Sequence, residues 1–93
     1  MLKRIKNVSV LDVSLATGKL TVWRKKYEFD KVSDVLTTFF VAIDAKIQDT
    51  NGNALSLSQL KARNRVTVDY IKDNDGGLVA SNVIVVHGSY ERR

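Results

Sequence analysis

The feature that most constrains this fold is an alternation of apolar and polar residues that recurs in short runs along the chain. Val66, Val68 and Tyr70 form one such run, and a period of two is typical of a strand with one buried face. Glycines in polar clusters, such as Gly18 and those of residues 73–77, separate the runs and indicate turns. The pattern predicts five strands, near residues 4–15, 19–29, 38–43, 65–72 and 78–87.

The length and composition limit what these strands can build. A chain of 93 residues, 44% of them hydrophobic and 27% charged, fits a single small domain over residues 1–93. The absence of cysteine excludes disulfides, thiolate metal sites and a cysteine nucleophile. No run approaches the roughly 20 apolar residues of a membrane helix, so we expect no membrane insertion.

Two segments carry further local signals. In the first predicted strand the apolar positions change phase after Val10, which predicts a β-bulge near Val10 and Leu11. Residues 30–38 are compatible with a helix, because several apolar residues have helical spacing. Their β-branched content favours an extended form instead, and the sequence leaves both open.

A short helix is predicted near residues 57–62. Ser56 and Gln59 have the spacing of a capping box, and Leu55 and Leu60 that of a hydrophobic staple. Asn64 is a suitable left-handed residue to end the helix. Three strands, a short helix and a hairpin follow one another in this order. We therefore expect a mainly all-β fold, a small five-stranded OB-like barrel with one short helix between strands 3 and 4.

Much of the chain resembles a family of small bacterial OB-like β-barrel domains of unknown function, often found in exported or envelope-associated proteins. The resemblance spans roughly residues 20–86 and is carried by residues 27–29, 45–47, 51–61, 65–70 and 76–85. Such domains usually carry Gly-Asp before the fourth strand, where this chain has Arg63-Asn64. The resemblance implies the fold and an envelope or periplasmic location if a signal peptide has been removed, and otherwise a cytoplasmic one. It implies no catalytic residues.

The net charge of +5 is concentrated at the ends of the chain. Lys3, Arg4 and Lys6 lie near one end and residues 91–93 at the other, whereas residues 7–90 hold ten Lys/Arg and nine Asp/Glu. Flexible basic ends favour weak nonspecific binding more than a shaped site.

The sequence predicts neither an enzyme nor a cofactor or metal site. Residues 49–53 faintly resemble a calcium loop, but Ala54 and Leu60 stand where an EF-hand needs Gly and Glu. Asp73 and Asp75 lie in a turn without a third ligand. His87, the only histidine, has no evident partner for general-base chemistry. Ser56 and Ser58 lack the context of a nucleophile elbow.

One cluster combines aromatic residues and cations: Trp23, Arg24, Lys25, Lys26 and Tyr27. OB domains bind single strands on strands 2 and 3 by stacking bases on aromatics and neutralising phosphates. Trp23 and Tyr27, with Phe39, could form such a platform, although aspartates in the 73–77 turn would repel phosphate. Alternatively, Trp23 closes the barrel and the cations protect an edge strand.

The function that we expect from the sequence is a non-enzymatic structural or interaction module, with a protein partner in a larger assembly. The alternative is an OB-type module that binds single-stranded nucleic acid or another polyanion. The partner itself stays unknown at this stage.

Overall fold

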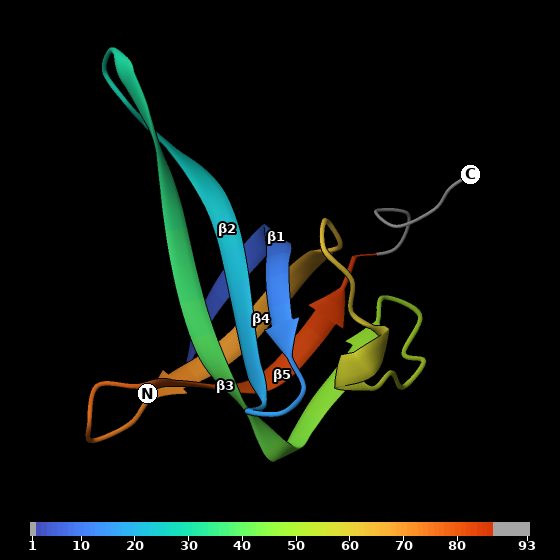
Figure 1. Cartoon of the computed structure of the whole chain (residues 1–93). Helices are drawn as coiled ribbons and strands as arrows, with labels where there is room; N and C mark the ends of the chain where they lie inside the picture. Colours follow the sequence, from blue (N-terminus) through green and yellow to red (C-terminus); the bar gives the residue numbers. More distant parts are fainter. Residues whose placement is uncertain (1, 87–93) are drawn as a thin grey trace.

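A computed structural model describes residues 2–86, which form an all-β fold without an α-helix in that range (Figure 1). Its elements are β1 (Lys3–Ser14), β2 (Lys19–Glu28), β3 (Lys31–Asp49), the 3-10 turn η1 (Leu57–Gln59), β4 (Arg65–Lys72) and β5 (Leu78–Val85). Four of the predicted strands are confirmed to within one to two residues at the ends that can be compared. The predicted end of the fifth, at His87, lies outside the described residues.

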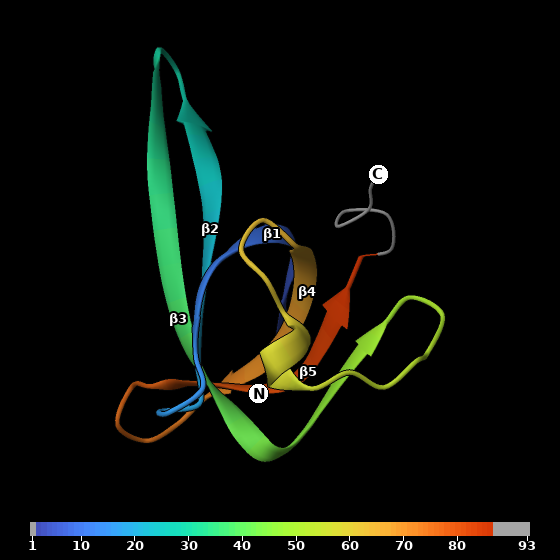
Figure 2. The ribbon, with the colours of Figure 1, turned by 45° about the vertical axis from the view of Figure 1, so that its right-hand side comes forward.

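The five strands form one sheet that closes on itself in the order β1-β2-β3-β5-β4, with β4 pairing back onto β1 (Figures 1 and 2). The pairings are antiparallel except for that between β3 and β5, which run parallel. Closure leaves no unpaired edge along most of the ring, which removes a common route to aggregation.

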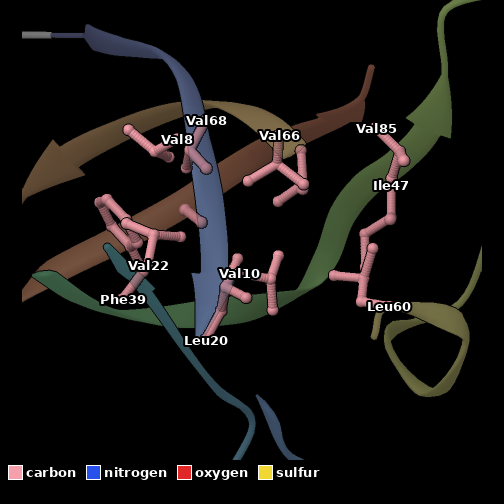
Figure 3. Packing of buried hydrophobic residues seen from close by; sticks show 12 residues of the cluster. Val8, Val10, Leu20, Val22, Phe39, Ile47, Leu60, Val66, Val68 and Val85 are labelled. Carbon is pink, nitrogen blue, oxygen red and sulfur yellow. The ribbon is translucent and has the colours of Figure 1, made fainter. Parts of the chain in front are cut away.

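A valine-rich core fills the ring (Figure 3). Alternate residues of each strand point inward, as the period of two predicts, and β-branched side chains suit this pleated surface. Leu60 follows η1 and lies beside Ile47 and Val85, so the segment after η1 covers one end of the core (Figure 3). The largest fully buried side chains are Val8, Leu20, Val22, Phe39, Val66, Val68 and Val83.

Two irregularities bend β1 around the ring. The predicted bulge is confirmed: the register with β2 shifts between Val10 and Asp12, and Leu11 is left exposed. A second shift, in the pairing with β4, falls between Ile5 and Val8. Asn7 there takes φ +54°, a conformation that asparagine tolerates better than most residues. This second irregularity was not predicted, although Ile5 and Val8 have opposite parity.

β3 is much longer than predicted. The sequence indicated a strand over residues 38–43 and left residues 30–38 open, but β3 runs over 19 residues from Lys31 to Asp49. Its first part pairs with β2 up to Glu28↔Lys31, and the hairpin projects beyond the ring (Figure 1). Residues 24–35, where neither strand has a second neighbour, are called the arm below.

The predicted helix at residues 57–62 is wrong in length and type. The Ser56–Gln59 capping box is present, and the Ser56 N–H donates to Gln59 Oε1 at 2.7 Å. The segment is only one 3-10 turn, because Leu60 already has extended backbone angles and is drawn into the core. A local cap does not outweigh the cost of helix nucleation. Arg63, at φ +77°, takes the left-handed conformation that we predicted for Asn64.

A polar network runs across four strands of the ring. Arg4 of β1 binds both carboxylate oxygens of Asp69 on β4, with Nη2 2.9 Å from Oδ2. Asn82 of β5 donates to Asp69 Oδ2 at 3.2 Å, and Gln48 of β3 donates to Asn82 Oδ1 at 3.3 Å. Arg4 therefore lies in a strand and an ion pair, not in the flexible basic end that the sequence suggested.

Candidate functional site

Trp23 lies where β2 separates from β1. It is opposite Ser9 in the last β1–β2 pair, and beyond it β2 continues into the arm. Leu20 and Val22 point into the core, so Trp23 and Tyr27 share the opposite, outer face, as their parity predicted. Trp23 is half-buried, whereas Tyr27 is 74% exposed. Trp23 is therefore not part of the core, which does not support the interpretation in which it closes the barrel. Arg24, Lys25 and Lys26 do lie on the part of β2 that has no second strand neighbour.

A hollow of about 310 Å³ opens beside Trp23. It is lined by side chains from β1, β2 and the start of β4: Asn7, Ser9, Trp23, Arg24, Lys25, Tyr27 and Arg65. The Lys25 ammonium lies 5.9 Å from the centre of the Trp23 ring, within the range of a cation–π contact. Arg65 Nη1 donates to the carbonyl of Asn7 at 3.3 Å, which holds its guanidinium at the rim.

A second hollow, of about 320 Å³, shares Trp23 and Ser9 with the first. Its lining comes from the β1 bulge and the segment before β4: Ser9, Val10, Leu11, Trp23, Ala62 and Arg63. The two hollows together are called the Trp23 groove. Tyr27 lines the first of these hollows and Arg63 the second.

The charged residues that line the Trp23 groove all have the same sign. Arg24, Lys25, Arg63 and Arg65 contribute four cations, and no carboxylate is among the lining residues. Residues 7–90, which are almost neutral overall, thus carry a local positive patch, although Asp34 pairs with Lys25 across β2 and β3. Such a patch attracts anionic ligands and raises their rate of association.

Four of the five residues singled out in the sequence line this groove: Trp23, Arg24, Lys25 and Tyr27. Lys26 is not among the lining residues, and its Nζ lies 3.8 Å from Glu28 Oε2. Phe39, proposed as a third platform residue, is fully buried on the opposite face of the sheet. Its ring packs against Tyr70 at 5.0 Å between centroids, so the platform contains two aromatics.

Sequence reasoning missed Arg63, Arg65 and Asn7. These residues lie about 40 positions after Trp23, or 16 before it, and only ring closure brings them together. Ser9 is the link, because it pairs with Trp23 on one side and with Arg65 on the other. The phase change in β1 was a sequence signal for this arrangement. A bent strand can pair with two different strands and bring residues of both close together.

The acidic β4–β5 turn lies away from the groove. β4 begins at Arg65, and the turn that contains Asp73 and Asp75 follows its last residue, Lys72. Seven residues of strand separate Arg65 from Lys72, roughly 23 Å. The electrostatic objection raised from the sequence therefore does not apply to this site.

One carboxylate in each of the acidic turns at residues 49–53 and 73–77 accepts hydrogen bonds from backbone N–H groups. Asp49 Oδ1 accepts the N–H groups of Asn51 and Asn53 at 2.9 and 3.0 Å. Asp73 Oδ1 accepts those of Asp75 and Gly77 at 3.0 and 2.8 Å. These are the hydrogen bonds of Asx-type turns. Within residues 2–86 no three acidic, histidine or cysteine side chains gather as metal ligands.

Another hollow, of about 380 Å³, lies near the end of the described chain. Leu55, Ser58, Gln59, Lys61, Asn64 and Val85 line it. Asn64 is buried, and its Oδ1 accepts the Lys61 N–H at 2.8 Å, so its side chain serves the local turn. This hollow has one cation and no aromatic side chain in its lining, so it has fewer groups that could bind an anionic or aromatic ligand than the Trp23 groove.

Comparison of the chain with models of protein families, with curated proteins and with solved structures finds no match. The family resemblance seen in the sequence therefore stays a prediction. In the part of the chain that the structure describes, no helix has the length and hydropathy to cross a bilayer.

Proposed function

We propose that this chain is a non-enzymatic binding module of the OB type, and that the Trp23 groove binds single-stranded nucleic acid. This adopts the alternative reached from the sequence, and it remains compatible with an interaction module in a larger assembly. The observation that carries it is the gathering of four cations around an aromatic pair, with no carboxylate among the lining residues.

The fold part of the proposal is supported by the order of elements. Five strands close as β1-β2-β3-β5-β4, β1 is bulged, and η1 lies between β3 and β4. OB barrels are small five-stranded Greek-key barrels that bind oligonucleotides on strands 2 and 3. The Trp23 groove lies along β2, next to the segment where that strand pairs with β3.

Each component of the groove has a counterpart in a single strand. Unpaired bases stack on exposed aromatic faces, and Trp23 and Tyr27 lie on one face of β2, four residues or about 13 Å apart. The flanking arginine and lysine side chains neutralise phosphates. The bases of a duplex are stacked on one another, so a duplex could bind the cations through its phosphates but could not stack on Trp23 and Tyr27.

The lining residues also support a non-catalytic role. Cations, one amide, one hydroxyl and two aromatics face the groove, and none of its side chains is a carboxylate or imidazole that could act as a general base. The hydroxyl belongs to Ser9, which lies among strand pairs and has no adjacent base.

Trp23 is the only tryptophan, so its fluorescence reports directly on the groove. We expect an unlabelled oligonucleotide to quench this fluorescence. The affinity should fall steeply as the salt concentration rises, because binding releases counterions from the phosphates of the oligonucleotide. Trp23→Ala should weaken binding by about 1–3 kcal/mol, the usual contribution of one stacked base, measured with a labelled oligonucleotide. Arg65→Ala should reduce the slope of log affinity against log salt concentration by about one.

Lys72→Ala is the matched control, because it removes one exposed cation from the far end of β4. It should leave affinity nearly unchanged. Trimming residues 1–3 and 91–93 should likewise retain most of the binding. Equal loss with Lys72→Ala and Arg65→Ala, or loss on trimming alone, would show nonspecific attraction and contradict the proposal. Equal affinity for heparin and single strands, insensitive to Trp23→Ala, would also contradict the stacking component.

A further inference from the structure

The outer face of the arm carries a ladder of side-chain pairs that begins at the Trp23 groove. Residues directly opposite one another in an antiparallel pair point to the same face of the sheet. The successive pairs on this face are Trp23–Leu36, Lys25–Asp34 and Tyr27–Val32. Asp34 therefore shares the face of the two aromatic rings, and its pair lies between theirs along the arm.

Asp34 is a diagonal neighbour of both rings. It lies two residues from the partner of Trp23 in one direction, and two residues from the partner of Tyr27 in the other. Diagonal neighbours in an antiparallel sheet are about 7–8 Å apart, a distance that large groups can bridge. A base that stacks on either ring, with its edge turned towards the middle of the arm, can therefore reach the Asp34 carboxylate.

The Asp34 carboxylate is also free to accept hydrogen bonds. Asp34 is exposed, and among residues 2–86 its side chain has no ion pair or hydrogen bond. The ammonium of Lys25, the residue opposite, lies 5.9 Å from the centre of the Trp23 ring. Glu28 Oε2, by contrast, lies 3.8 Å from Lys26 Nζ. The fold thus places beside the groove an acceptor that it does not itself use.

We propose that Asp34 gives the Trp23 groove a preference for guanine among the bases of a single strand. An ionised carboxylate only accepts hydrogen bonds, and its two oxygens can accept two at once. The Watson–Crick edges of unpaired bases are open to such contacts. Guanine presents two adjacent donors there, N1–H and the N2 amino group, whereas adenine, cytosine and thymine each present a donor next to an acceptor. This inference rests on the proposed function and names the base that the groove selects.

The same carboxylate disfavours the other bases. A single strand that crosses the arm brings its phosphates near Asp34, and like charges repel. A pair of base donors offsets this repulsion, whereas a base that turns an acceptor towards the carboxylate adds to it. Selectivity of this kind comes from a penalty on the wrong ligand as well as from a contact with the right one.

Three labelled oligonucleotides test the preference. Each is an oligothymidine of about 10 nucleotides, within the site sizes of single OB folds. One contains thymine only, one has a single central guanine, and one has a single central hypoxanthine, a purine that lacks the N2 amino group. The wild type should bind the guanine probe about tenfold more tightly than the thymine probe, as a bidentate contact allows. The hypoxanthine probe should bind with an intermediate affinity, as measured by fluorescence anisotropy.

Two variants assign the preference to one residue. Asp34→Asn keeps the size of the side chain but replaces an acceptor with a donor. It should abolish the preference for guanine and leave binding of the thymine probe equal or tighter, because a negative charge near the phosphates is lost. Asp12→Asn is the matched control. Asp12 is exposed and pairs with Thr21, on the other side of Trp23 from Asp34, so its replacement should retain the preference.

The outcomes separate this inference from the proposed function. Equal affinity of the wild type for the three probes, or a guanine preference that survives Asp34→Asn, would overturn the inference and leave single-strand binding intact. Loss of the preference with Asp12→Asn as well would indicate a general effect of charge and would overturn the assignment to Asp34. If the wild type binds none of the probes, the proposed function itself is wrong, and the inference with it.

Discussion

The ring and the arm are built from the same two strands but treat their side chains in opposite ways. In the ring, β2 and β3 bury their inward residues, such as Val22 and Phe39. In the arm the inward positions of β2 become polar, with Arg24 and Lys26. The outward positions alternate between the apolar pair Tyr27–Val32 and the charged pair Lys25–Asp34. Alternation therefore specifies an extended strand in both regions, but it does not specify which face will be covered, or by what.

The difference between ring and arm predicts how each responds to substitution. The ring has a continuous core and a polar network between β1, β4 and β5, so its contacts are shared and loss of one should affect global unfolding. In the arm each strand pairs only with the other, as Lys25 does with Asp34 and Tyr27 with Val32. It can fray without opening the ring.

The largest expected effect comes from replacing a phenylalanine in each region. Phe39 is fully buried in the ring, whereas Phe29 at the tip of the arm is 112% exposed. Phe39→Ala should destabilise the protein by about 3–5 kcal/mol, because it removes apolar contacts and leaves a cavity. Phe29→Ala should change the free energy of unfolding by less than about 0.5 kcal/mol. Chemical denaturation of both variants measures this, and similar losses would contradict the distinction between ring and arm.

The second effect concerns ion pairs. Asp69 is buried in the ring, and Asp69→Ala should cost about 1–3 kcal/mol through loss of its hydrogen bonds to Arg4 and Asn82. Glu28 pairs with Lys26 in the arm at 3.8 Å, with both side chains half-exposed. Glu28→Ala should cost less than about 1 kcal/mol, as surface pairs do. An equal loss for the two variants would show that the Asp69 network adds little to the ring.

The Asp69 network also predicts a dependence on pH. The hydrogen bond from Arg4 lowers the pKa of Asp69 below its ordinary value of 3.8, against the opposing effect of burial. Its stabilising contribution is therefore complete above that ordinary pKa and is lost as pH falls through the lower, folded-state pKa. As the pH falls below 5, the free energy of unfolding should decrease less for Asp69→Asn than for the wild type, as followed by urea denaturation. Parallel acid losses in the two proteins would contradict this assignment.

A smaller effect should come from the left-handed residues. Arg63 has φ +77° in the ring and Phe29 has φ +46° in the arm, where glycine would be unstrained. Arg63→Gly should stabilise the protein by about 0.5–1 kcal/mol, since the relief of strain exceeds the added backbone entropy. Phe29→Gly should raise global stability less, because the arm frays independently. Arg63→Ala keeps the strain and is the control; if it stabilises equally, the strain argument fails.

The smallest effect is expected at the η1 turn. The Ser56 hydroxyl contacts the exposed side chains of Ser58 and Gln59, at 2.8 and 3.2 Å. Capping residues of full helices contribute about 0.5–2 kcal/mol, but this cap serves a single 3-10 turn. Ser56→Ala should therefore cost about 0.5 kcal/mol at most, measured from the denaturation midpoint. A loss above 1 kcal/mol would mean that η1 stabilises the ring far more than its length suggests.

Several parts of this fold could be predicted because their signals are local. The bulge at Leu11, the turns and four of the strands each follow from the residues within them. The end of β3 that lies in the arm could not be assigned, because residues 31–36 have helical as well as extended spacing and no core to decide between them. The helix after Ser56 was overestimated, because burial of Leu60 overrode the local cap.

The candidate site was predictable only in part for the same reason. Trp23, Arg24, Lys25 and Tyr27 are neighbours in sequence and could be recognised as a basic-aromatic cluster. Arg63 and Arg65 join them through the pairings of Ser9, which no local pattern shows. Of the other residues that the sequence suggested, Lys26 does not line the groove and Phe39 points into the core.

The closure of the ring has a consequence for the rate at which this protein folds. Arg4 and Asp69, which join β1 to β4, are 65 residues apart in the chain. Pairings between such distant segments slow folding, because the entropy of closing a long loop is lost before the contact forms. The β2–β3 hairpin, by contrast, is local and can form within microseconds. We expect a hairpin that forms first and a ring that closes around it in milliseconds to seconds, so stopped-flow refolding should show burial of Phe39 well after strand formation in the arm.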